Sequence, residues 1–308
     1  MFHAAHRLAR FTALLLVAVS LAACVGSAGA AGPTPNPTPI PSPTPTASPK
    51  PIDPNKVVFR VTWEGGFVTP EMLLERLPLI VVYADGRVIS QGPQIEIYPG
   101  PLMPNLRERT ISAEALDRLV VLAREKDLLR TVHFGFPGIA DAPDTVLEIE
   151  VDGKSYRVSA AALDAELGLG GDIEPGFEQL DEATVKGRTA LRAFIDALTG
   201  FPDGDYVDED HAFVFGGLSV YAGKAIIVPN SELPGEQPAV DWPLEDLATA
   251  GEPVTGGGLD VRCQVIEGDD LATVLPLLNG ANTLSTFRSE GDLYTLIVRP
   301  LLPGEAGC

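Results

Sequence analysis

The sequence TVLEIEVDGKSYRVSA, residues 145–160, predicts a β-hairpin. From Leu147 to Val151 apolar residues alternate with glutamates, which in an extended strand places the apolar side chains on one face and the carboxylates on the other. Asp152-Gly153 then interrupts the alternation, and this pair is typical of the two-residue turn whose central residues both need a positive φ. We therefore expect two antiparallel strands, Thr145–Val151 and Lys154–Ala160.

The same signal occurs upstream, where Asp85-Gly86 separates two apolar runs. It predicts a type I′ hairpin of Leu79–Tyr83 with Arg87–Ser90, preceded by a strand at Val57–Thr62. Helices are expected after Ser112, which is suited to an N-cap, and within Glu178–Leu198, which ends before Gly200. Hairpins and helices joined by short connections predict an α+β fold with antiparallel strands rather than a parallel βαβ fold.

The second half of the chain repeats this order of elements. A short helix is expected at Leu271–Leu278, limited in length by Pro276, and Glu290-Gly291-Asp292 separates two strands after it. This order suggests two similar subdomains, at 56–200 and 201–308, with the acidic segment Asp203–Asp210 at the boundary. The strands expected in this half are Ala212–Phe215, Leu218–Tyr221, Ala225–Val228, Val261–Ile266, Leu284–Ser289 and Leu293–Arg299.

The first residues form an export signal. Met1–Arg10 is basic, and Phe11–Leu21 is apolar but shorter than the roughly 20 residues that span a bilayer. Leu21-Ala22-Ala23-Cys24 follows and resembles the lipobox of bacterial lipoproteins. The resemblance implies that residues 1–23 are removed, that the Cys24 thiol carries a diacylglyceryl group, and that the protein is extracytoplasmic and anchored to the cell membrane by lipid. An ordinary secretory signal with an incidental cysteine is the alternative.

Residues 24–55 are predicted to be a disordered tether. Proline stands at nearly every second position from Pro33 to Pro45, interleaved with Thr, Ser and Asn. Such spacing prevents helix and sheet pairing and favours extended polyproline II. The segment is therefore expected to act as a semi-rigid spacer between the anchor and the globular region.

Three Gly/Pro-rich blocks carry a second resemblance, which covers most of the globular region. They are Tyr83-Ala84-Asp85-Gly86-Arg87-Val88-Ile89, Ile97-Tyr98-Pro99-Gly100-Pro101 and Arg299-Pro300-Leu301-Leu302-Pro303. The blocks are similar to those of uncharacterised lipoproteins of high-GC bacteria. The resemblance implies no activity.

The formal net charge of −20 restricts the partners of the protein. It argues against nucleic acid and against direct docking on anionic lipid headgroups. Cations or basic partners are compatible with it, and so is an acidic surface that serves only solubility.

Two cysteines lie in the globular region, Cys263 and Cys308. Export places them in an oxidising compartment, so we expect a disulfide that ties the last residue to a strand. A catalytic thiol is the alternative, but it needs a lowered pKa, and neither Arg262 nor the C-terminal tail supplies an obvious base.

No cofactor is expected apart from a candidate calcium ion. Asp203, Asp205, Asp208 and Asp210 supply the hard oxygen ligands that calcium prefers. Their spacing does not match an EF-hand, and a solvated charge run is the alternative reading.

The sequence contains no intact catalytic motif. Gly217-Leu218-Ser219-Val220-Tyr221 begins like a nucleophile elbow but has Tyr221 in place of the second glycine. We therefore expect a binding or envelope-interaction module with a protein or glycan partner. One alternative is a hydrolase whose acids come from Asp141, Asp144 and Asp203–Asp210; a purely structural envelope lipoprotein is another.

Overall fold

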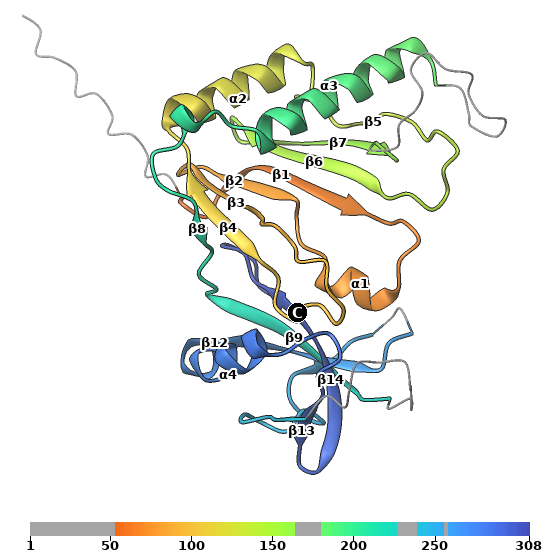
Figure 1. Ribbon diagram of the computed structural model, residues 1–308. Helices are drawn as coiled ribbons and strands as arrows, with labels where there is room; N and C mark the ends of the chain where they lie inside the picture. Colours follow the sequence, from red (N-terminus) through yellow and green to blue (C-terminus); the bar gives the residue numbers. More distant parts are fainter. Residues whose placement is uncertain (1–52, 164–179, 227–238, 256–257) are drawn as a thin grey trace, which may run out of the picture. The chain divides into compact units, whose positions relative to one another are not determined.

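The predicted α+β class is confirmed by the computed structural model, which describes residues 53–163, 180–226, 239–255 and 258–308 (Figure 1). The signal segment, Cys24 and most of the predicted tether lie outside the described residues. The described residues belong to one compact unit and build two open sheets. The division at residue 200 stays a prediction, although the first sheet takes its last strand from residues 211–212.

The first sheet has eight strands in the order β5-β7-β6-β1-β2-β3-β4-β8, paired antiparallel except for β5 with β7. Helices α2 and α3 lie side by side over one face of it (Figure 1). The bounds are β1 Val57–Glu64, β2 Ile80–Tyr83, β3 Arg87–Gln91, β4 Leu106–Thr110, β5 Val132–His133, β6 Asp144–Val151, β7 Lys154–Ala161, β8 His211–Ala212, α1 Pro70–Glu75, α2 Ala113–Glu125 and α3 Glu182–Thr199.

Both expected hairpins are present, but only one has the expected turn. Asp152 and Gly153 have φ of 54° and 71°, as a type I′ turn between β6 and β7 requires. Between β2 and β3 only Gly86 has a positive φ, so the type I′ prediction there was wrong. The Asp85 carboxylate accepts the backbone N–H of Arg87 at 3.1 Å, and this local bond favours a three-residue loop with glycine in the left-handed position.

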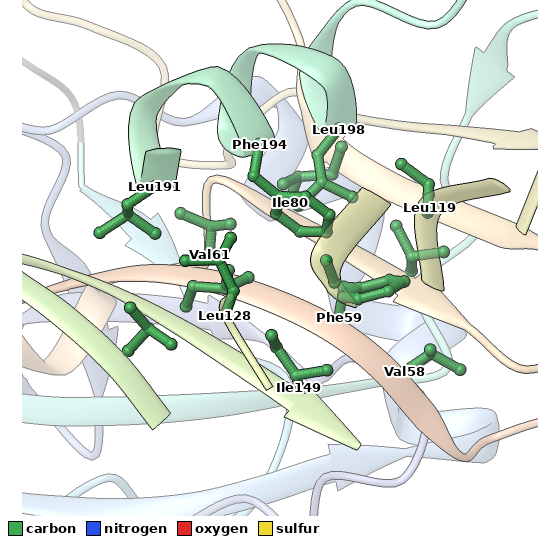
Figure 2. Packing of buried hydrophobic residues seen from close by; sticks show 14 of the residues in the cluster. Val58, Phe59, Val61, Ile80, Leu119, Leu128, Ile149, Leu191, Phe194 and Leu198 are labelled. Atoms are coloured by element: carbon green, nitrogen blue, oxygen red, sulfur yellow. The ribbon is translucent and has the colours of Figure 1, made fainter. Parts of the chain in front are cut away.

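The core of the first sheet forms between its strands and α2 and α3 (Figure 2). Apolar residues of β1 and β6 pack here, and the rings of Phe59 and Phe194 lie 5.3 Å apart. Both helices begin at side-chain caps. The Ser112 hydroxyl accepts the N–H of Ala115, as predicted, and Asp181 accepts that of Thr184.

The second sheet has six strands in the order β10-β13-β14-β9-β12-β11, and α4 packs against one face of it (Figure 1). Its bounds are β9 Gly217–Lys224, β10 Val240–Asp241, β11 Glu252–Pro253, β12 Val261–Glu267, β13 Phe287–Ser289, β14 Asp292–Pro300 and α4 Gly268–Gly280.

Several boundaries in this half were wrong. Helix α4 continues through Pro276, because the apolar contacts of Val274 and Leu278 on either side hold the helix against the sheet despite the missing N–H. Strand β9 is one element up to Lys224, and Ala225 and Ile226 are not in a strand. The strand expected at Ala212–Phe215 is reduced to β8, because it pairs with β4 at only two positions.

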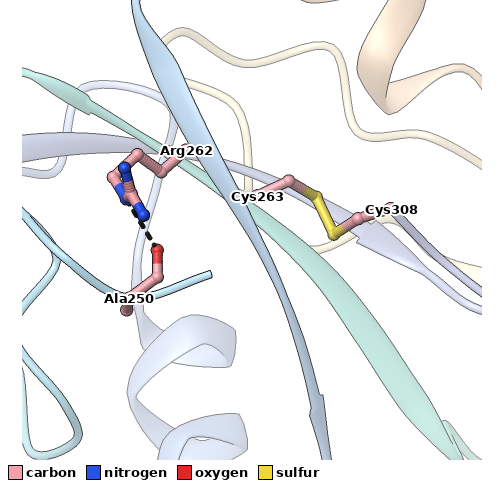
Figure 3. Close-up of a disulfide and its surroundings, with 4 residues drawn as sticks. All are labelled: Ala250, Arg262, Cys263 and Cys308. Carbon is pink, nitrogen blue, oxygen red and sulfur yellow. Dashed lines mark hydrogen bonds between the residues drawn. A yellow bond between two sulfur atoms is a disulfide. The ribbon is translucent and has the colours of Figure 1, made fainter. Parts of the chain in front are cut away.

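After β14 the C-terminal segment, residues 301–308, returns to contact both sheets. Leu302 packs with Val81 and Tyr83 on the face of the first sheet opposite its helices. Cys308 is bonded to Cys263 of β12, with a Cα–Cα distance of 5.9 Å (Figure 3). The predicted disulfide is therefore confirmed, and one short segment joins the two halves of the fold.

Candidate functional site

A cavity of about 390 Å³ lies where α1, the second sheet and the C-terminal segment meet. We call it the C-terminal cavity. Its position follows from β9, where successive side chains point to opposite faces of the sheet. Leu218 and Val220 pack in the core beneath α4, so Ser219 points to the other face, where the cavity lies. The lining residues are Leu73 and Leu74 of α1, Ser219 and Tyr221 of β9, Arg299 of β14, and Glu305, Ala306 and Gly307.

The wall of the C-terminal cavity contains a bidentate ion pair. Glu305 accepts Nη1 of Arg299 at 2.8 Å and Nη2 at 3.1 Å, and it also accepts the backbone N–H of Leu302 at 3.1 Å. A second guanidinium, that of Arg60 in β1, lies 3.6 Å from the same carboxylate. Burial alone would raise the pKa of Glu305, but these hydrogen bonds and cations outweigh it and lower the pKa. Glu305 is therefore ionised at neutral pH.

Three polar atoms around this ion pair are buried and have no hydrogen-bond partner among the described residues. They are the Ser219 hydroxyl, the Tyr83 hydroxyl and Nε of Arg60. Burial raises the pKa of Tyr83 to about 12, with Arg60 lowering it in part. Only Ser219 lines the C-terminal cavity, and its residue is 1% exposed. A buried hydroxyl without a partner carries a desolvation cost that a bound ligand would remove.

A second cavity, of about 360 Å³, lies over the first sheet and is lined by charged residues. Arg60, Glu148 and Arg157 stand in register across β1, β6 and β7. Arg157 pairs with Glu64 at 2.6 Å and with Glu148 at 3.7 Å. This surface has the cross-strand ion pairs expected of a solvated sheet face, so it is the weaker candidate.

The four aspartates predicted to bind calcium lie in the segment that precedes β8, and three of them bind different groups of α2 and β4. Asp205 pairs with Arg118 of α2. Asp208 accepts the Thr110 N–H at 2.6 Å, and Asp210 accepts two nitrogens of Arg107. Asp203 begins a short 3₁₀ turn, Asp203–Asp205. In the parts of the chain that are described, no three His, Cys, Asp or Glu residues are grouped to hold a metal. Calcium binding here stays a prediction.

Two parts of the hydrolase alternative, Asp144 and the acidic segment Asp203–Asp210, are not brought together. Asp144, in β6, lies 3.2 Å from Nε2 of His133. The acidic segment contacts β4, four strands away in the sheet, which corresponds to roughly 19 Å at the usual strand spacing. Glycosidase carboxyl pairs are about 5–9.5 Å apart. Asp144 and Asp203–Asp210 therefore cannot act on the same glycosidic bond.

The residues of the C-terminal cavity were not predicted as a site. In the sequence, Ser219 stands in an incomplete nucleophile elbow, and Arg60 and Glu305 belong to no recognisable motif. One signal was available: Arg60 is a charged residue inside the apolar strand VVFRV, residues 57–61. A cation at such a position indicates a buried partner.

Comparisons of this chain with protein-family models, with curated proteins and with solved structures gave no match. Of the helices in the described ranges, none combines the length and the apolar character needed to cross a bilayer. The resemblance to lipoproteins and the lipid anchor at Cys24 stay predictions.

Proposed function

We propose that this protein is a lipid-anchored extracytoplasmic binding module whose ligand occupies the C-terminal cavity. The observation that carries the proposal is the Ser219 hydroxyl, which is buried, lines the cavity and has no partner among the described residues. Small-molecule sites are typically concave, with apolar walls and a few convergent polar groups. The leucines of α1, together with Ser219, Arg299 and Glu305, supply that combination.

The lining residues favour binding over catalysis. A serine nucleophile needs a general base within hydrogen-bond reach. Glu305 is the one carboxylate among the lining residues, and it is engaged by Arg299 and by the Leu302 N–H. A carboxylate whose pKa is lowered in this way is a poor proton acceptor.

The anchoring part of the proposal is tested with Cys24→Ala. Export of the wild-type chain should give a membrane-associated protein that incorporates radiolabelled palmitate, because the lipobox cysteine carries the acyl chains. The variant should lose the label and leave the membrane fraction. Retention of the label by the variant would overturn the assignment of Cys24.

The binding part is tested with the full exported chain and a panel of monosaccharides, amino acids, dipeptides and short carboxylic acids. Saturation-transfer NMR should show at least one compound that binds the wild type and that binds Ser219→Ala about five- to tenfold more weakly. Thr295→Val is the matched control, since Thr295 is an exposed residue of the neighbouring strand β14 and does not line the cavity. No binding across the panel, or binding that Ser219→Ala leaves unchanged, would overturn the C-terminal cavity as the site.

A further inference from the structure

We infer that the C-terminal cavity takes a neutral, hydroxyl-bearing ligand, and that a sugar residue of an envelope glycan is the class that fits. This inference rests on the proposed binding function. Its basis is the hydrogen-bonding state of each polar group in the cavity wall.

The cation of the wall is not free to bind an anionic ligand. Both Nη atoms of Arg299 donate to Glu305, and its Nε donates to the backbone carbonyl of Arg76 at 3.2 Å. Each of the three nitrogens of the guanidinium therefore donates within the protein, and of its five N–H groups only one, on Nη2, has no acceptor among the described residues. A ligand carboxylate would have to displace Glu305, which the Leu302 N–H and the charge of Arg60 also hold in place.

The anion of the wall is equally unsuited to a cationic ligand. Glu305 is neutralised by Arg299 in a bidentate pair and has Arg60 3.6 Å away. An ammonium group near Glu305 would meet two guanidinium charges, and like charges in a poorly solvated site repel strongly. The two charged residues that line the cavity, Arg299 and Glu305, therefore compensate each other, and neither offers an unpaired charge to a ligand.

The remaining hydrogen-bonding capacity suits hydroxyl groups. The Ser219 hydroxyl can both donate and accept. Oε1 of Glu305 accepts one hydrogen bond, from Nη2 of Arg299, and has Nη2 of Arg60 3.6 Å away, beyond hydrogen-bond distance, whereas Oε2 accepts two. Since a carboxylate has about four lone-pair sites, Oε1 can accept another donor. Neighbouring hydroxyls of a sugar can serve both groups: one donates a hydrogen bond to Oε1, and the next accepts one from the Ser219 hydroxyl.

The apolar part of the wall suits the C–H face of a sugar ring. Leu73 and Leu74 come from α1, a helix that has no buried residue, and Leu73 is 49% exposed. The Tyr221 side chain adds an aromatic ring on the β9 side. The volume of about 390 Å³ lies at the lower end of small-molecule sites, about 300–1,000 Å³. This size fits one or two rings of a glycan.

The test compares sugars that share a ring and differ in charge. Glucose, galactose and N-acetylglucosamine are titrated into the full exported chain, beside glucuronate, galacturonate and glucosamine, with saturation-transfer NMR as the readout. We expect a neutral sugar to bind at least tenfold more tightly than its charged counterparts. Ser219→Ala should weaken that binding about five- to tenfold through the lost hydrogen bond, and Thr295→Val should leave it unchanged.

A second variant, Leu73→Ser, tests the apolar wall at an exposed position where folding is not at risk. It should weaken neutral-sugar binding and leave the midpoint of thermal unfolding unchanged. Tighter binding of a uronate or an amino sugar would overturn the ligand class while the binding function stands. Binding of amino acids or peptides without any sugar would do the same. Absence of binding by every compound in both panels would overturn the proposed function itself.

Discussion

The Glu305 carboxylate accepts both Nη groups of Arg299, at 2.8 and 3.1 Å. Arg299 belongs to β14 of the second sheet, and the same carboxylate faces Arg60 of β1 in the first sheet. The backbone N–H of Leu302, in the C-terminal segment itself, also donates to this carboxylate. One partly buried anion therefore fixes the segment to both sheets and at the same time forms part of the cavity wall.

Glu305→Gln should lower stability in a pH-dependent way. The folded pKa of Glu305 is lowered, so its contribution is present above the unfolded value of 4.5 and is lost as pH falls through the folded pKa. At pH 7 the loss should be about 2–4 kcal/mol, because two guanidinium groups lose their anion. Urea unfolding between pH 3 and pH 7 should show that the free energy of unfolding falls less steeply with acid in the variant than in the wild type.

Glu150→Gln is the control, because Glu150 forms an exposed pair with Lys56. It should change the free energy of unfolding by less than about 1 kcal/mol. Equal losses for both variants would contradict this prediction.

Tyr83→Phe should be neutral or stabilising at pH 7 by up to about 1 kcal/mol. The Tyr83 hydroxyl is buried without a partner among the described residues, so removing it removes a desolvation cost. The pKa of Tyr83 is raised to about 12, so this residue favours folding below the unfolded pKa near 10, and that contribution is lost as pH rises through 12. The variant should therefore lose less stability than the wild type between pH 9 and pH 12. A marked decrease in the free energy of unfolding of the variant at pH 7 would show that the Tyr83 hydroxyl makes a hydrogen bond in the wild type.

Removal of the disulfide should lower the free energy of unfolding and loosen the attachment of the C-terminal segment that forms one wall of the cavity. Cys263 and Cys308 are 45 residues apart, and closing a loop of that length is worth about 4 kcal/mol in the chain-entropy model. The Cys263→Ala/Cys308→Ala variant should unfold about 8–16 °C lower. Reduced wild type should behave in the same way in calorimetry. An unchanged midpoint in both samples would show that Leu302 and Glu305 hold the segment without the bond.

Calcium should not stabilise the protein through the acidic segment. Asp205, Asp208 and Asp210 each pair with a group of α2 or β4, and a calcium ion would have to break these contacts to collect its six to eight oxygen ligands. Thermal unfolding in calcium and in EDTA should therefore give the same midpoint. A saturable upward shift that Asp208→Asn abolishes would confirm calcium binding by this segment.

Local patterns predicted the parts of this fold that depend on neighbours in sequence. The alternation around Leu147, the Asp152-Gly153 turn and the Ser112 cap are each determined within a few residues. The C-terminal cavity depends instead on where residues 301–308 return, and no periodicity carries that information. Alternation places Ser219 on the face opposite the core, but it does not show that a distant segment covers this face.

Arg188 illustrates the same limit on a helix. An arginine within a helix is normally expected to be exposed to solvent. The Arg188 guanidinium is instead buried and donates to the carbonyls of Phe134 and Ala162. These acceptors lie in segments near β5 and β7, more than 25 residues away in sequence. Burial lowers the pKa of Arg188, and the carbonyls satisfy its donors. Contacts of this kind follow from tertiary packing and not from local pattern.

Gly187→Ala should destabilise the protein although alanine is the better helix former. In α3 a Cβ at this position would meet ring atoms of Phe134 at 2.2–2.6 Å, so the close approach of helix to sheet requires glycine. Overpacking of this kind costs about 1–3 kcal/mol, which exceeds the gain of about 1 kcal/mol from helix propensity. Gly280→Ala is the matched control, since a Cβ there meets nothing within 4 Å at the end of α4. Adding Phe134→Leu to Gly187→Ala should recover part of the loss in urea unfolding; a Gly187→Ala variant as stable as the wild type would show that the helix can move away from the sheet at no cost.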